Sequence, residues 1–311
     1  MLEISVVIPA YNVDKVLCKR AIDSILNQTF RDFEVLVVDD TAMDESGFYK
    51  SFADDRLQYV HNDSRLGMAQ SRNKAMSMAR GKYIAFTDAD DWSYPERFQK
   101  QFDFMEQNPT VDILGACFKM GEKCIRHPAN NGDIAFFMLM RECALGMPTV
   151  FMRKSSIERL DIRFPQNSII EDYDLWLSLV SKAVFANYPD VLLDYTIHPN
   201  SSSAAKGDAA IAQASARSRR RYQQMYFGFA FDWKERNEFS VSDWKVYQQQ
   251  VNELKNKNHL CRGKAELAYF DNVFRYIVRR TVREKGFRRA LLKADLPICF
   301  KIKQFFKEQK K

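Results

Sequence analysis

The sequence predicts an α/β fold with a mainly parallel central sheet. In the first 110 residues, β-branched apolar runs alternate with segments whose apolar residues recur at helical spacing. Two of the apolar runs are followed directly by aspartates. Because helices cover both faces of a parallel sheet, its strands are typically continuous apolar runs, as these are.

The first-half strands are expected, in chain order, at ISVVIPA, FEVLVVDD, LQYVH and KYIAFTD. A helix is predicted before the last of them, because Met68, Ala69, Ala75 and Met76 lie near helical spacing, and Gly81 follows as a stop signal. Ligands of such sheets bind beyond the carboxyl ends of the strands. Both VVDD and FTDADD place their acids there.

The second half has a mixed pattern. Strands are expected at VDILGACFKM, PTVFMRK and VFANYPDVLLDYTIH, a helix at 133–143, and a loop at PNSSSAAKGD. A further helix begins close to Glu171, since Tyr173, Trp176, Leu177 and Val180 form an apolar stripe. Helices are expected from about residue 209. We therefore predict a domain at 1–205, with halves 1–110 and 111–205, followed by a helical region at 206–311.

Composition excludes several classes of protein. Hydrophobic residues make up 46% and aromatic residues 13%, which is too rich for a disordered chain, and no apolar run approaches the length of a membrane span. The six cysteines are irregularly spaced, which favours reduced thiols over disulfides or a zinc site. The acidic residue near the amino terminus is atypical of a secretory signal, so a cytoplasmic protein is expected.

The net charge of +7 is unevenly distributed. Residues 275–311 contain thirteen Lys or Arg and three acidic residues, a net of 13 − 3 = +10, which leaves 7 − 10 = −3 for the rest. Apolar residues among these cations predict an amphipathic helix. It either packs on the domain or binds an anionic membrane surface, and we favour the membrane. Nucleic acid is disfavoured, because no aromatic-rich binding motif accompanies the cations.

The segment TDADDW crowds Asp88, Asp90 and Asp91 at a strand end. Like charges repel, so the cluster needs either bulk water, as a solvated turn, or a cation. On an extended backbone Asp88 and Asp90 point to the same side. One could then hold a ribose hydroxyl while the other binds a divalent metal, because Mg²⁺ and Mn²⁺ prefer carboxylate oxygens.

A second pair of acids, Asp39 and Asp40, ends another buried strand. Aspartate there often serves as a turn or helix cap. Alternatively, Asp40 could accept a hydrogen bond from a nucleobase N–H. The end of the first strand, SVVIPAYN, offers an aromatic ring at Tyr11 and open backbone groups against which a base could rest.

Six segments occur in an order that resembles the motif series of the family 2 inverting glycosyltransferases. They are SVVIPAYN, QTFRDFEVLVVDD, GMAQSRNKAM, GKYIAFTDADDWSYPERF, IIEDYDLWLSL and YTIHPNSSS, and they span roughly residues 3–203. The resemblance implies the Rossmann-like A-type nucleotide-sugar fold. The later segments look most like bacterial lipooligosaccharide β-1,3-N-acetylglucosaminyltransferases.

The resemblance also assigns donor-site residues, which are Pro9, Ala10, Tyr11, Asn12, Asp40, Arg72 and Asp88. The first four would line the uridine pocket, Asp40 would bind uracil, Arg72 would contact the nucleotide or diphosphate, and Asp88 would face the ribose. Asp90 would be a ligand of Mn²⁺ or Mg²⁺. This chain has Thr41-Ala42 where the family usually has Gly-Ser after the paired aspartates, so the shape of that loop is open.

The resemblance places the general base on Asp172. The same residue could cap its helix, and a helix amino terminus would keep its carboxylate ionised. Asp174, the nearest rival, would point roughly opposite. Glu171 and Asp91 are the expected acceptor contacts. His198 is either structural or, as in the family, a ligand of the metal or diphosphate.

Taken together, these features predict a metal-dependent inverting glycosyltransferase at the inner membrane face. It would move one sugar, GlcNAc before Gal or Glc, from a UDP-sugar to a glycan or glycolipid acceptor and form a β-linkage. The absence of a Q-x-x-R-W segment disfavours a processive synthase. A non-catalytic nucleotide-sugar-binding protein is the alternative. A nucleotidyltransferase is disfavoured, because PAYNVDK stands where its Gly-rich loop would follow the first strand.

Overall fold

The computed structural model describes residues 2–199, 201–231, 233 and 241–256. The chain divides into two compact units, Met1–Arg219 and Arg220–Lys311. The division falls later than the boundary expected at 205, because helix α9 (Asp208–Phe227) begins within the first unit, where its Ser218 hydroxyl donates to Asp174. The basic segment 275–311 lies outside the described residues.

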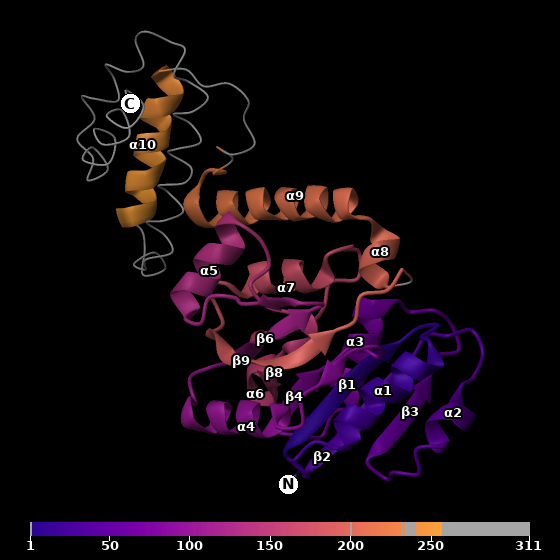
Figure 1. The fold of residues 1–311 in the computed structure, drawn as a ribbon. Coiled ribbons are helices and arrows are strands. Elements are labelled where there is room, and N and C mark those ends of the chain that lie inside the picture. The colour runs from indigo at the N-terminus through magenta and orange to yellow at the C-terminus, as the bar shows by residue number, and fades with distance from the viewer. Residues whose placement is uncertain (1, 200, 232, 234–240, 257–311) are drawn as a thin grey trace. The chain divides into compact units, whose positions relative to one another are not determined.

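The first unit is built on a sheet with strand order β3-β2-β1-β4-β8-β6-β9-β5, and β7 pairs with β6 (Figure 1). The strands are β1 (Ile4–Ala10), β2 (Phe33–Asp39), β3 (Leu57–His61), β4 (Tyr83–Phe86), β5 (Trp92–Ser93), β6 (Ile113–Met120), β7 (Lys123–Ile125), β8 (Phe151–Arg153) and β9 (Phe185–Tyr195). Strands β1 to β4 pair in parallel, as do β6 and β9. The remaining pairs, β4–β8, β6–β8, β5–β9 and β6–β7, are antiparallel. The predicted α/β fold is confirmed.

The helices of the first unit are α1 (Lys15–Leu26), α2 (Ser46–Lys50), α3 (Met68–Met78), α4 (Arg97–Gln107), α5 (Asn131–Met140), the 3₁₀ helix η1 (Met147–Thr149), α6 (Lys154–Leu160), α7 (Glu171–Leu179), α8 (Ser202–Lys206) and α9. Helix α8 lies inside the expected loop 199–208. The expected strand at 148–154 is shortened to β8, because η1 occupies Met147–Thr149; Pro148 lies in its first turn, where the missing N–H leaves no bond unmade.

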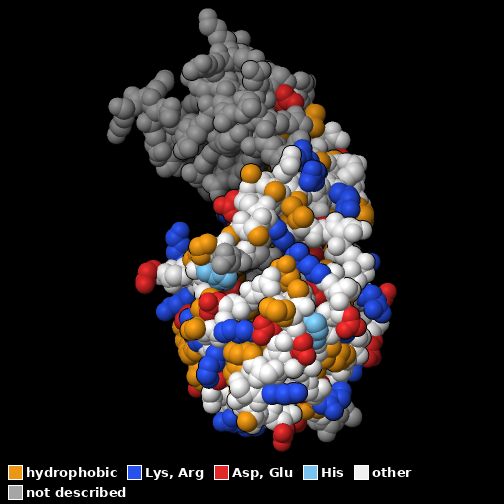
Figure 2. Space-filling model, turned by 90° about the vertical axis from the view of Figure 1, so that its right-hand side faces the viewer, with side chains coloured by type: hydrophobic (Ala, Val, Ile, Leu, Met, Phe, Trp, Pro, Cys, Tyr) orange, Lys and Arg blue, Asp and Glu red, His pale blue; other side chains and the backbone are white. Residues whose placement is uncertain are grey.

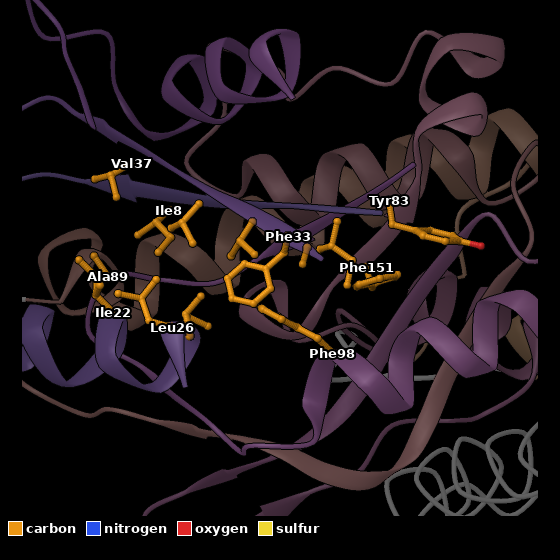
Figure 3. Close-up of a cluster of buried hydrophobic side chains, with 14 of the residues drawn as sticks. Ile8, Ile22, Leu26, Phe33, Val37, Tyr83, Ala89, Phe98 and Phe151 are labelled. Atoms are coloured by element: carbon orange, nitrogen blue, oxygen red, sulfur yellow. The ribbon is translucent and has the colours of Figure 1, made fainter. Parts of the chain in front are cut away.

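The hydrophobic core fixes α1 against the parallel strands. Every residue of β1, β2 and β4 is buried, as expected for strands covered on both faces. Figure 3 shows the core side chains converging from these strands and from α1, α4 and β8: Ile8, Ile22, Leu26, Phe33, Val37, Tyr83, Phe98 and Phe151. Asp14 starts α1 as its N-cap, since its side chain accepts hydrogen bonds from the N–H groups of Val16 and Leu17.

Gly81 is required for a different reason than the sequence suggested. Helix α3 already ends at Met78, and its cap Ala79 has an extended backbone. A Cβ atom on Gly81 would come within 2.5 Å of the Ser5 nitrogen and 2.6 Å of the Ile4 carbonyl carbon. Glycine therefore lets the chain pass directly beside β1 as it enters β4.

The described part of the second unit contains α10 (Val241–Asn256) and a small aromatic core. Trp233 and Tyr247 are 0% and 1% exposed, and the Trp233 indole N–H donates to the side-chain oxygen of Gln250 at 2.8 Å. None of the helices described in either unit combines the length and the apolar character needed to cross a bilayer.

Candidate functional site

The acidic segments meet at one edge of the sheet, which we call the carboxyl edge. Strands β1, β2 and β4 run in parallel and end there, so the residues that follow them are neighbours (Figure 1). The carboxyl end of β9 lies at the same edge, because Thr196, the residue after β9, donates hydrogen bonds to Asp90 and Asp91 in the segment that follows β4. Sequence segments about a hundred residues apart thus form one site.

The segment after β1 is more constrained than the sequence suggested. Pro9 and Ala10 belong to the buried strand, and the Ala10 carbonyl accepts the Asp40 N–H at 2.9 Å. Asn12 adopts a left-handed conformation with φ of 49°, and its N–H donates to Thr41 Oγ1 at 2.9 Å. Two of the backbone groups expected to be open, the Ala10 carbonyl and the Asn12 N–H, are therefore occupied, and Thr41 connects its loop to the end of the first strand.

Tyr11 remains available as a ring surface. Its side chain is 42% exposed, and the guanidinium of Arg65 lies 4.1 Å from the ring centroid. An arginine stacked on an aromatic face is favourable through cation–π attraction. A base that rests on Tyr11 would meet Arg65, a residue that no motif in the sequence marked.

Asp40 anchors the loop before α3. Its Oδ1 accepts from the Asn62 side chain at 2.6 Å and from the Leu66 N–H at 3.2 Å, and its Oδ2 accepts from the Gly67 N–H at 2.7 Å. The residue is 6% exposed. Oδ2 has capacity for one further bond, since a carboxylate oxygen has two acceptor positions. Asp40 thus has a structural role, beside which a uracil contact stays a prediction.

The DADD segment forms a turn and not the extended backbone that was expected, because the Asp91 N–H donates to the Asp88 carbonyl at 3.4 Å. Ala89 and Asp91 are buried, whereas the side chains of Asp88 and Asp90 keep 27% and 21% exposure. Asp88 and Asp90 are therefore the pair that remains accessible, although the geometric reason differs from the predicted one.

Asp88 faces Arg72, whose Nη2 lies 3.3 Å from Asp88 Oδ1. Because protein surrounds this carboxyl on most sides, desolvation raises the pKa of Asp88, and Asp90 adds to the rise although Arg72 opposes it. Arg72 is 4% exposed, and its Nε–H has no partner among the described residues. The guanidinium therefore keeps one donor for an incoming oxygen.

Asp90 and His198 form the candidate metal pair. Asp90 Oδ2 lies 2.7 Å from His198 Nε2, and the Asp90 carbonyl accepts from Thr196 Oγ1 at 2.6 Å and from Arg20 Nη2 at 3.1 Å. The two groups are hydrogen-bonded to each other here; the carboxylate oxygen suits either Mn²⁺ or Mg²⁺, whereas the imidazole nitrogen suits Mn²⁺ better. No group of three or more metal-ligating side chains occurs among the described residues. Mg²⁺ sites are often completed by substrate phosphates and water.

Asp91 does not fit the acceptor role expected for it. The residue is 1% exposed, its Oδ1 accepts the Thr196 N–H at 2.8 Å, and its Oδ2 is buried without a partner among the described residues. Burial raises the pKa of Asp91 to about 9, and Asp88 contributes to the rise. Asp91 instead holds the end of β9, and hence His198, against the DADD turn.

Asp172 lies on the first turn of α7, but Ile170 occupies the N-cap position, so Asp172 is not the cap. Its Oδ1 accepts its neighbour's N–H, that of Tyr173, at 2.8 Å. The sequence suggested that the helix start keeps this carboxylate ionised. Burial instead raises the pKa of Asp172, and the charge of Glu171 adds to the rise, which brings the group closer to the range of a working general base. Asp174 points elsewhere, toward Ser168 and Ser218.

Glu171 is held by two cations. Arg72 Nη1 lies 3.2 Å from Oε1, and Lys206 Nζ lies 3.1 Å from Oε2. Sequence reasoning gave no role to Lys206, Arg20 or Thr196: Lys206 lay in an expected loop, Arg20 lies in none of the motif segments, and in the segment YTIHPNSSS only His198 was singled out. Their partners are 35 to 106 residues away in the chain, so no local pattern could have marked them.

A separate pocket of about 650 Å³ runs along α1 and is lined in part by Lys19, Phe48 and Trp92. Asp88, Asp90 and Asp172 do not line it, so it is not the carboxylate site. On the face shown in Figure 2, acidic, basic and histidine side chains are interspersed with hydrophobic ones.

Residues 5–159 match the family model described as Glycosyl transferase family 2. Through these residues the chain belongs to glycosyltransferase family 2. An uncharacterized glycosyltransferase of Methanocaldococcus jannaschii is 29% identical over 268 residues, which cover 78% of this chain and 84% of that protein. The Escherichia coli protein WfaP, named UDP-Glc:alpha-D-GlcNAc-diphosphoundecaprenol beta-1,3-glucosyltransferase, is 27% identical over 68% of this chain and 84% of its own length.

Solved structures support the fold of this family 2 glycosyltransferase. S. aureus TarS in complex with UDP-GlcNAc matches with a TM-score of 0.57 at 16% identity, covering 89% of this chain and 90% of that one. The mannosyltransferase PcManGT of Pyrobaculum calidifontis, in complex with GDP-Man and Mn²⁺, matches with a TM-score of 0.53 at 16% identity, covering 92% and 82%. At this identity the likeness establishes the A-type glycosyltransferase fold.

Proposed function

We propose that this glycosyltransferase moves a hexose from a UDP-sugar to a hydroxyl of a lipid-linked glycan with inversion at the anomeric carbon. The observation that carries the proposal is the convergence of three elements at the carboxyl edge: Asp88, the pair Asp90–His198, and Asp172. Together they supply a donor contact, a metal pair and a base. The non-catalytic alternative would leave Asp172 without a role.

The UDP-sugar would be bound by groups that can make a further hydrogen bond. Asp88 would accept from the ribose hydroxyls, and Asp40 Oδ2 from the uracil imino N–H. The unpartnered Nε–H of Arg72 suits a diphosphate or sugar oxygen, because charge-assisted hydrogen bonds are short and strong. Asp90 and His198 would hold Mn²⁺ or Mg²⁺, which when bound neutralises the charge that develops on the departing diphosphate.

The transfer step would depend on Asp172. Its carboxylate would take the proton of the acceptor hydroxyl as that oxygen forms a bond to the anomeric carbon and the bond to the UDP oxygen breaks. Attack from the face opposite the leaving group converts an α-linked donor into a β-glycoside. One proton moves to Asp172 and the electron pair of the broken bond leaves with UDP.

The names of two relatives suggest a donor sugar and an acceptor for this protein. Sequence motifs favoured GlcNAc, whereas WfaP and WfgD of Escherichia coli are both named as UDP-Glc glucosyltransferases that act on GlcNAc-diphosphoundecaprenol. We therefore place UDP-Glc first and UDP-GlcNAc second, with a lipid diphosphate-linked sugar as acceptor. Such an acceptor lies at a membrane surface, to which the basic segment 275–311 would bind.

The test is UDP release from UDP-Glc, UDP-GlcNAc and UDP-Gal, measured with Mn²⁺ and a GlcNAc-diphosphate lipid. Release should require metal and acceptor, and Asp172→Asn should lower kcat by roughly 10²–10⁴-fold while UDP affinity is retained. Asp174→Asn, on the same helix, is the matched control and should keep activity within about tenfold. Undiminished turnover in Asp172→Asn would place the base elsewhere, and UDP binding without transfer to any acceptor would favour the non-catalytic alternative.

A further inference from the structure

We propose that Glu171 is a positioning residue for the base Asp172, held in place by Arg72 and Lys206, rather than a contact for the acceptor. The inference rests on the transfer reaction proposed above and concerns the same site. It assigns functions to Lys206 and to the Nη1 group of Arg72. It also changes the role that the sequence suggested for Glu171.

The geometry leaves little of Glu171 for a substrate. The residue is 6% exposed, and each of its carboxylate oxygens already accepts from a different cation, Arg72 at 3.2 Å and Lys206 at 3.1 Å. A buried carboxylate fixed by two charge-assisted hydrogen bonds is held in one position, and removing one partner leaves an uncompensated charge. Each oxygen keeps a second acceptor position, but the side chain is only 8% exposed, which leaves an acceptor hydroxyl little access to it.

The two cations come from segments that are far apart in the sequence. Arg72 belongs to α3 in the nucleotide-binding half, and its Nη2 also faces Asp88 at 3.3 Å. Lys206 is the last residue of α8, in the segment that follows His198. Glu171 is the first residue of α7 and Asp172 is the second, so the carboxylate that the cations hold is adjacent to the base. These ion pairs link Asp88, Arg72, Glu171 and Lys206 in series. They therefore connect the start of α7 to Asp88, the residue proposed to contact the sugar-nucleotide donor.

The charges around Asp172 give this arrangement a measurable effect. The groups that face Asp172 are Glu171, Arg72, Lys206, Asp88 and Cys143. Burial raises the pKa of Asp172 and Glu171 adds to the rise, whereas Arg72 and Lys206 lower it. Neutralising Glu171 should therefore lower this pKa, and neutralising Lys206 should raise it.

The direct experiment is a carbon-13 NMR titration of the Asp172 carboxyl, assigned with Asp172→Asn, in the metal-free full chain. The titration midpoint should fall in Glu171→Gln and rise in Lys206→Met relative to the wild type. Lys206→Arg should restore the wild-type midpoint because it keeps the charge. Lys182→Met is the matched control, since Lys182 is exposed beyond the end of α7, and it should leave the midpoint unchanged.

Kinetics then separate positioning from acceptor binding. In Glu171→Gln, kcat should fall on the order of tenfold, because the base is misaligned. The acid limb of the pH profile of kcat should move to lower pH, and the KM for the acceptor should stay within about twofold of the wild-type value. A raised acceptor KM with unchanged kcat and acid limb would overturn the proposal and return Glu171 to the acceptor site.

The titration does not depend on turnover, so the two proposals fail separately. Unchanged midpoints in both Glu171→Gln and Lys206→Met would overturn the positioning role even in an active enzyme. If the wild type releases no UDP but the midpoints move as expected, the proposed sugar transfer is overturned and the positioning role of Glu171 stands. Lys206 is 28% exposed on its side chain, so Lys206→Met is expected to fold if Glu171→Gln does not.

Discussion

Aspartates follow two strands of the same sheet, β2 and β4, but they differ in how many hydrogen-bond donors they contact. At the end of β2, Asp40 accepts three hydrogen bonds from neutral donors, and Asp39 accepts from the Thr41 backbone and hydroxyl and from Tyr59. At the turn after β4, the buried Asp91 has an oxygen without a partner among the described residues. The same sequence signal thus produces a satisfied anchor at one strand end and an electrostatically unsatisfied cluster at the next.

The difference has a physical origin in the donors that each position can reach. The loop between β3 and α3 is placed so that the N–H groups of Leu66 and Gly67 point at Asp40. The turn after β4 crowds three carboxylates together, so burial and mutual repulsion raise the pKa of Asp88 and Asp91. Unsatisfied charge is costly, and proteins commonly retain it at sites where a ligand completes the arrangement.

The strongest test of this contrast is Asp40→Ala. The substitution leaves the buried Asn62 side-chain N–H and the partly buried N–H groups of Leu66 and Gly67 without their acceptor, so the free energy of unfolding should fall by about 4 kcal/mol. Urea denaturation followed by circular dichroism measures the change. Asp63→Ala, an exposed aspartate of the adjacent loop, should change stability by less than about 0.5 kcal/mol. Equal effects of the two substitutions would remove the anchor role of Asp40.

The pH dependence of stability tests the β4 turn. A folded pKa of about 9 lies above the unfolded value of Asp, so between these values the folded state binds more protons and stability falls as pH rises. Asp91→Asn removes this group, so in chelator it should gain about 2–3 kcal/mol relative to the wild type between about pH 6 and about pH 8. Parallel stability curves for wild type and Asp91→Asn would contradict the raised pKa.

The smallest expected effect is a gain in stability from Asp90→Asn. Removing one negative charge beside Asp88 and Asp91 should stabilise the metal-free protein by about 1 kcal/mol, because Asp90 contributes to the raised pKa of both neighbours. The stabilisation of the wild type by Mn²⁺, read as a rise in Tm, should disappear in this variant. Asp63→Asn should retain it. A destabilised variant that still responds to Mn²⁺ would exclude Asp90 as a metal ligand.

The fold could be predicted in large part from local patterns. Continuous β-branched runs identified β1, β2 and β4, and helical spacing identified α3 and α7, because strand and helix periods leave direct traces in sequence. Local reasoning was misleading where tertiary packing competes with it. The start of α7 suggested that the helix terminus sets the charge state of Asp172, whereas burial and the charge of Glu171 raise its pKa.

The sequence by itself determined that aspartates follow buried strands, since each continuous apolar run ends where the polar residues begin. The tertiary structure alone decided which of these carboxylates are satisfied. Arg72 reaches Glu171 across 99 residues and Thr196 reaches the Asp91 carboxylate across 105. A hydrogen bond and a desolvation cost depend on distances in space, and only the folded chain sets those distances.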